Sequence, residues 1–300
     1  MTKNMSNTSS NKQAIVVGVL SGALVVALGA IGFLLMARSE PSILDTSSAT
    51  TSTDAAKAEN SSPISPPSVS ESMKELFGLK QGADEAKTAP DILTQAAFSQ
   101  SFTLGKDRYF AQFFQSQQLL GTGELDESHA ATVRLSVLTY KQSGGTWEVV
   151  DKKTDLTESG AWGQLLSAPV ETLRLSAASM ALLVEEGSTA QGYTDSGKAV
   201  LVFTNHRWHD TGVIHTSSSN GGACDPDYKP GAGDDFMKPC YEHTGTISVA
   251  PDAQGDFPDL LVTKQGTQAG ENPDQIIPVK NVIVKYTKGK YVEHALPAQP

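Results

Sequence analysis

From about residue 98 onward, hydrophobic and polar residues alternate in short runs that are separated by glycine-containing turns. Segment 131–141 alternates in this way, the turn 142–145 follows, and the apolar run 146–150 returns. A period of two predicts strands that bury one face, and such a turn predicts a hairpin. The turn 287–290 predicts a second hairpin near the C-terminus. The predicted strands are 107–116, 131–141, 146–150, 171–175, 179–185, 198–204, 211–216, 244–249, 259–264, 281–286 and 291–293.

About ten short strands with frequent turns predict a mainly β domain over residues 98–300. The pattern fits an antiparallel sandwich, a barrel or a propeller-like meander, and it does not choose among them. Glycines and a proline at 160–170 mark a candidate sub-boundary, so one or two subdomains stay open. Ahead of this domain, 70–97 is a lead-in. It begins with a short predicted helix at 70–79, capped by Ser72 with Glu75 completing a capping box.

Residues 14–37 form an apolar run without a single charged residue. A helix of this length spans about 36 Å, enough to cross about 30 Å of hydrocarbon. The alternative is a cleavable signal peptide, but its apolar region is about 7–15 residues long and ends at a small-residue cleavage site. We therefore expect a transmembrane helix. Lys3 and Lys12 precede it, which favours a cytoplasmic tail at 1–13 and a C-terminal domain outside the cytoplasm.

Gly18 and Gly22 in this run form a GxxxG pattern. Small residues at this spacing permit a transmembrane homodimer, although they are also common in membrane helices generally. Residues 38–69 are rich in Ser, Thr, Ala and Pro. A segment with so few apolar side chains predicts a disordered tether that holds the domain off the bilayer.

The net charge of the chain limits the classes of partner that it can bind. The formal net charge is −10, and the three basic residues before position 39 have no acidic neighbours there, so the remainder is more acidic still. Such a surface repels nucleic acid and anionic lipid headgroups. It favours solubility, or the binding of cations and basic partners.

Cys224 and Cys240 are the two cysteines of the chain. In an extracytoplasmic domain, two cysteines most simply form a disulfide, which here would close a loop containing three prolines. A metal-thiolate or redox pair is the alternative. The enclosed segment is also a candidate binding loop because it carries four acidic side chains, namely Asp225, Asp227, Asp234 and Asp235.

Segment 252–262 resembles the calcium loop of FG-GAP repeats in integrin-like propellers, which runs D-x-N-G-D-G-x-P-D-L before a strand. This resemblance implies a Ca²⁺ site at Asp252, Gln254, Asp256 and Asp259. Two departures stand out: Gln254 replaces the usual Asn or Asp, and the glycine after the third ligand is missing. The alternative is a turn that enters a strand.

The chain lacks a nucleophile elbow, a zinc-protease helix motif, a P-loop and a dinucleotide fingerprint. The sequence therefore favours a single-pass, membrane-anchored periplasmic protein that binds a ligand or an envelope partner without catalysis. This architecture resembles that of membrane-anchored proteins of proteobacteria and implies a bacterial inner membrane. A periplasmic hydrolase using dispersed carboxylates and a calcium-stabilised adhesion-type module are the alternatives.

Overall fold

The computed structural model describes residues 64–229 and 237–295. These residues form two large antiparallel β-sheets and one short helix, which confirms the mainly β prediction. A short parallel pair, β10 (Cys224–Asp225) and β11 (Lys238–Pro239), lies apart from both sheets in the pairing. The predicted transmembrane helix at 14–37, its GxxxG pattern and most of the tether lie outside the described residues. Within the described ranges, no helix is long and apolar enough to cross a membrane.

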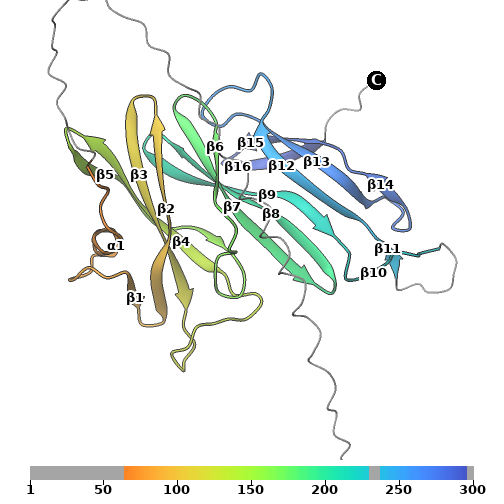
Figure 1. Cartoon of the computed structure of the whole chain (residues 1–300), viewed down its shortest axis with the longest axis horizontal. Coiled ribbons are helices and arrows are strands. Elements are labelled where there is room, and N and C mark those ends of the chain that lie inside the picture. Colours follow the sequence, from red (N-terminus) through yellow and green to blue (C-terminus); the bar gives the residue numbers. More distant parts are fainter. Residues whose placement is uncertain (1–63, 230–236, 296–300) are drawn as a thin grey trace, which may run out of the picture. The chain divides into compact units, whose positions relative to one another are not determined.

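The first sheet is a meander in which each strand pairs with the next along the chain (Figure 1). Two-residue turns such as 105–106 and 144–145 join neighbouring strands, so the order in space follows the order in sequence. Its strands are β1 (Glu85–Ala89), β2 (Ile92–Leu104), β3 (Asp107–Gln118), β4 (Val133–Ser143) and β5 (Thr146–Ser159).

The second sheet curls into a half-barrel. Strands β9 and β12 form ladder pairs only between Glu242 and Ser219 and between His243 and Ser218. Gly245 still lies close to the Thr216 carbonyl, where a Cβ would come within 3.0 Å of it. An ion pair of 2.8 Å between Lys290 on β16 and Asp210 on β9 spans the curl. Its strands are β6 (Glu171–Arg174), β7 (Ser179–Ala190), β8 (Tyr193–Thr204), β9 (Arg207–Ser219), β12 (Glu242–Val249), β13 (Leu260–Ala269), β15 (Val282–Thr287) and β16 (Lys290–Ala295), with β14 (Ile276–Pro278) beside β13.

Alternation along the strands builds two apolar cores. On β8, Leu201 and Phe203 face the first sheet, where they join Phe113 and Leu135 in one core between the sheets. Trp208 lies in this core, and its indole N–H donates to the Thr139 hydroxyl at 2.9 Å. The neighbouring positions of β8 face the other way and line the inside of the curled sheet. This second core contains Val200, Val202, Ile214, Leu260, Val262 and Val284.

The short helix α1 (Val69–Phe77) is present, but its predicted cap is wrong. Ser68 is the N-cap, and it forms the capping box with Glu71. Ser72 is instead buried within the helix and accepts a hydrogen bond of 3.1 Å from the Tyr140 hydroxyl. The sequence offers two Ser-x-x-Glu patterns four residues apart, and packing against Tyr140 on β4 selects the first.

The predicted hairpins at 142–145 and 287–290 are confirmed as the β4–β5 and β15–β16 turns. The sequence analysis missed β1 and β2. Strand β2 is rich in Gln, Ser and Thr, and a bulge between Ala96 and Phe98 shifts its register against β3. The bulge interrupts the period of two, so no single alternating pattern runs along the strand.

Candidate functional site

The stapled loop begins at Cys224, which forms the expected disulfide with Cys240. Asn220 supports the base of this loop: its side-chain amide donates to the Pro239 carbonyl at 2.9 Å, and its carbonyl oxygen accepts from the Tyr241 N–H at 2.7 Å. The disulfide and Asn220 together fix the end at which β9 and β12 meet. The Asp225 carboxylate accepts from the backbone N–H of Asp227, while Asp234 and Asp235 lie outside the described residues.

The loop before β13 contains the residues that the calcium resemblance singled out. The Asp256 carboxylate accepts a hydrogen bond from the Thr204 hydroxyl at 2.9 Å and one from Ser176 at 3.4 Å. Asp259 lies 3.9 Å from the Lys285 ammonium, whereas Asp252 and Gln254 are exposed. The described residues contain no group of three or more His, Cys, Asp or Glu that could hold a metal ion. The loop therefore uses Asp256 to attach itself to β8, and calcium binding here stays a prediction.

Two hollows in the described part of the chain bring together residues that sequence reasoning did not connect. The first, which we call the polar mouth, is a hollow of about 210 Å³ that residues of β6, β7, β8, β9 and β12 line. Because Lys198 follows the alternation of β8, it points to the same side as Val200 and Val202 and lies at the rim of the inner core. The other polar side chains that line the polar mouth are Glu171, Glu185, Ser196, Ser217, Thr216, Thr244 and Thr246.

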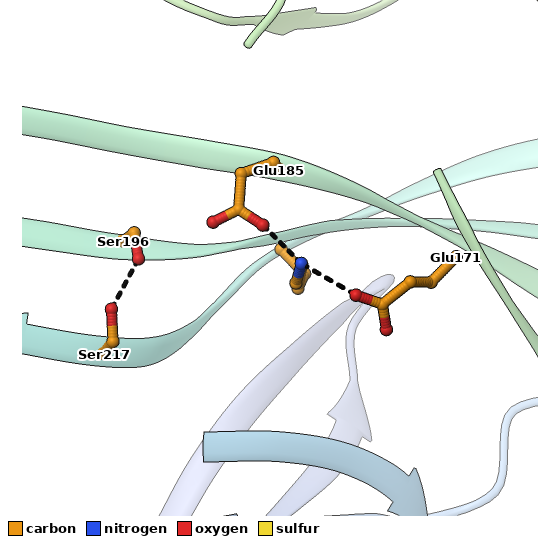
Figure 2. A network of polar contacts seen from close by, with 5 residues as sticks. Glu171, Glu185, Ser196 and Ser217 are labelled. Atoms are coloured by element: carbon orange, nitrogen blue, oxygen red, sulfur yellow. Dashed lines mark hydrogen bonds and ion pairs between the residues drawn. The ribbon is translucent and has the colours of Figure 1, made fainter. Parts of the chain in front are cut away.

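Lys198 stands between two carboxylates in the polar mouth (Figure 2). Its ammonium donates to Glu171 at 3.0 Å and also to Glu185, and only 15% of its side chain is exposed. Burial alone would lower the pKa of Lys198, but the hydrogen bonds to Glu185 and Glu171 outweigh it and raise the pKa. Ser196 and Ser217 share a hydrogen bond of 2.5 Å beside this network. Lys198, its two carboxylate partners and the two serine hydroxyls thus satisfy one another.

The second hollow, which we call the β2 groove, has a volume of about 500 Å³. One wall is β2 at 96–100, and the opposite wall is the segment 164–170, which connects the two sheets. Val184 on β7 also lines it. Half-buried apolar side chains cover much of its surface; they are Ala96, Ala97, Phe98, Leu165, Leu166 and Val170. The segment expected as a sub-boundary is therefore the wall of a groove.

Side chains of β3 and β7 hold this connecting segment in place. The Gln115 side-chain oxygen accepts from the Leu165 N–H at 3.5 Å, and the Gln117 amide donates to the Gly163 carbonyl at 2.5 Å. Glu186 accepts from the Gly160 N–H at 3.2 Å. Burial raises the pKa of Glu186, although its hydrogen bonds offset part of the effect, and its second oxygen is buried without a partner among the described residues.

The edge of β2 that faces away from β3 is unpaired beside the groove. Strand β1 covers this edge only from Ile92 to Gln95. The two-residue turn at 105–106 makes Leu104 and Asp107 a hydrogen-bonded pair, so the odd-numbered residues 99–103 direct their N–H and C=O groups outward. Arg174 confirms this direction, because its guanidinium donates to the Thr103 carbonyl at 2.5 Å.

Ser99 is exposed, and in the described ranges its backbone groups have no partner on the outer side. This edge escaped the sequence analysis because β2 itself was missed. A sequence signal exists, since Phe98, Phe102 and Leu104 alternate with polar residues.

No family model matches the chain, and neither a curated protein nor a solved structure matches it.

Proposed function

We propose that this protein is a non-catalytic binding module that holds an extended segment of an envelope protein in the β2 groove. The unpaired edge of β2 carries this proposal. Backbone N–H and C=O groups on a free edge accept an additional strand, which gives affinity through main-chain hydrogen bonds. A single-pass anchor at 14–37, oriented with the C-terminal domain in the periplasm of a bacterial inner membrane, would present the groove as part of an envelope scaffold.

The geometry of the edge limits the size of the occupant. The part of β2 without a neighbouring strand on this side runs from Ala96 to Phe102, because β1 pairs with Gln95 at one end and Arg174 caps Thr103 at the other. Within it, the Gln100 side chain donates to the Ser101 carbonyl at 3.0 Å, and an added strand would replace this bond. At about 3.3 Å per residue this leaves room for a strand of about six or seven residues. The added strand would continue the line of β1, whose first residue pairs with Gln95.

The walls of the groove select the side chains of the occupant. Successive residues of a strand point to opposite sides, so alternate side chains of the occupant would enter the hollow beside Phe98, Leu165 and Val170. Apolar side chains at every second position are the best match for these walls. In the polar mouth, the raised pKa keeps the Lys198 ammonium charged, so this side chain pairs with the two carboxylates and does not act as a base.

Site-specific photo-cross-linking in cells tests the proposal with the full-length chain. A photoreactive amino acid at Leu166 faces the groove, and Ser99→Pro removes an outward N–H without breaking the β2–β3 ladder. Ser99→Ala is the matched control, since it removes the hydroxyl and keeps the N–H. We expect one discrete cross-linked envelope protein with the otherwise unmodified chain and with Ser99→Ala, and its loss with Ser99→Pro. Adducts that persist in Ser99→Pro, or their complete absence from all three chains, would contradict strand addition at this edge.

A further inference from the structure

Trp162 occupies the first central position of a tight two-residue turn. Ala161 and Gln164 exchange two backbone hydrogen bonds of 3.1 Å, and between them Trp162 has a φ of 58° and Gly163 a φ of 67°. Positive φ at both central positions is the pattern of a type I′ turn, which favours Asn, Asp or Gly at the first of them. A bulky side chain in the left-handed region is uncommon and costs conformational energy.

The other two-residue turns of the described strands carry smaller or unbranched flexible residues at the same position. Asn205 begins the β8–β9 turn with a φ of 49°, and Gly144 begins the β4–β5 turn with a φ of 53°. Gln191 and Lys288 occupy the corresponding places in the β7–β8 and β15–β16 turns. Trp162 is the aromatic residue of this set.

The surrounding structure holds the Trp162 turn in its strained form. The Gly163 N–H donates to the Ala131 carbonyl at 2.8 Å, and the Gln117 and Glu186 contacts described above fix the flanking residues. A Cβ at position 163 would lie 2.2 Å from the Asp126 carbonyl oxygen, so the turn sits directly on the backbone of the preceding loop. Strain that several contacts maintain is typical of sites with a function.

Burial explains only part of the Trp162 side chain. Trp162 is 46% exposed, and the ring that it contacts belongs to His129, which is itself exposed. The buried part of the ring contributes to stability, and the exposed part of a large aromatic ring is a common anchor for a binding partner.

The charged residues around the turn indicate which kind of partner the Trp162 ring would bind. The loop at 119–132, on which the turn rests, contains Glu124, Asp126 and Glu127 and has no Lys or Arg. Hydrogen bonds from the Ser128 backbone and side chain lower the pKa of Asp126, so this half-buried carboxylate stays charged at neutral pH. An aromatic face beside negative charge suits a cation, because the ring quadrupole and the carboxylates attract it together.

We propose that Trp162 and the loop at 119–132 form a second binding site, which takes a Lys or Arg side chain of a protein partner. The cationic group would lie on the free face of the indole, and the carboxylates of the loop would steer it there. This site rests on the turn and its surroundings and does not depend on the β2 groove.

The substitution Trp162→Asn tests this site because it separates stability from binding. Asn is favoured at the first position of the turn, so the full-length variant in nonionic detergent should melt a few degrees higher than the original chain. The binding probes are two fluorescein-labelled decapeptides in which Gly alternates with Lys or with Arg. We expect at least one of them to bind the original chain and to bind Trp162→Asn at least fivefold more weakly.

Two further variants make the outcome decisive. Trp162→Phe keeps an aromatic ring and should recover part of the binding, whereas Glu127→Gln should weaken binding less than Trp162→Asn and reduce its salt dependence. Equal binding of both peptides to the original chain and to Trp162→Asn would overturn the proposal. So would a lower melting temperature of Trp162→Asn, which would make the ring structural. Trp162-dependent binding of a neutral oligosaccharide such as chitotetraose, without peptide binding, would assign the ring to carbohydrate instead.

Discussion

Strand β7 lines both the polar mouth and the β2 groove, but the two hollows differ in whether their hydrogen-bonding groups already have partners within the protein. In the mouth, Lys198 bridges Glu171 and Glu185, and the Ser196 and Ser217 hydroxyls pair with each other. In the groove, the outward backbone groups of Ser99 have no partner in the described part of the chain. A hydrogen-bond network whose groups are all paired stabilises the fold, whereas unpaired backbone donors and acceptors on a strand edge can bind another strand. This difference is the reason why we propose the β2 groove, and not the polar mouth, as the binding site.

The largest expected effect comes from removing the disulfide that fixes one end of the mouth. The double variant Cys224→Ser with Cys240→Ser frees a loop of about 15 residues, which should lower the free energy of unfolding by about 3 kcal/mol. Chemical denaturation measures this loss, and reduction of the original chain is the control. Hydrogen exchange should accelerate in β12 and leave β2 unchanged. Equal acceleration in both strands would mean that the two hollows are not independent.

A smaller loss of stability is expected from breaking the ion network of the mouth. Lys198→Met leaves two carboxylates facing each other, which should lower the free energy of unfolding by about 1–2 kcal/mol, since Glu171 is largely exposed. Lys198→Met combined with Glu185→Gln removes one of these charges and should recover part of the loss.

The same network predicts a pH dependence. The native state raises the pKa of Lys198 above its value in the unfolded chain, so the stabilisation is complete below about pH 10 and is lost as the pH rises through the native value. The difference in stability between the original chain and Lys198→Met should therefore shrink in alkaline solution. A difference that stays constant up to pH 11 would contradict the assigned role of the ammonium.

On the groove side, Glu186→Gln should increase stability. Burial raises the pKa of Glu186, so the native state binds the proton more tightly than the unfolded chain and the charged form is unfavourable near neutral pH. Removing the charge should add about 1 kcal/mol at pH 7. This gain should vanish below about pH 4, where the carboxyl is protonated in both states. Thermal melting over this pH range measures it, and a gain that persists in acid would have another cause.

The smallest effect on stability is expected at the free edge. Ser99→Pro should change the free energy of unfolding by no more than about 0.5 kcal/mol, because the N–H that it removes points to solvent. Gln100→Pro removes a bond to β3 and should cost about 1–3 kcal/mol. Similar losses for the two neighbouring variants would show that the outward direction assigned to Ser99 is wrong.

Local patterns explain what could be predicted from the sequence. The hairpins at 142–145 and 287–290 depend on a few consecutive residues, and the disulfide needs only two cysteines in one domain, so both predictions hold. Strand β2 could not be recognised in the same way, because its bulge shifts the alternation between Ala96 and Phe98. The helix cap was ambiguous for a related reason: Ser68 and Ser72 offer equivalent local patterns, and contact with Tyr140 decides between them.

The sequence by itself determined the β character of the domain, two of its turns and its cysteine pair, because these follow from periodicity, turn chemistry and composition. Only the tertiary structure decided where the hollows lie. The β2 groove lies between residues 96–100 and 164–170, and the polar mouth is lined by β6, β7, β8, β9 and β12. Each hollow therefore depends on contacts between residues far apart in the chain. The sequence contains Trp162 but does not show its positive φ, and this backbone conformation is what makes it a candidate binding residue.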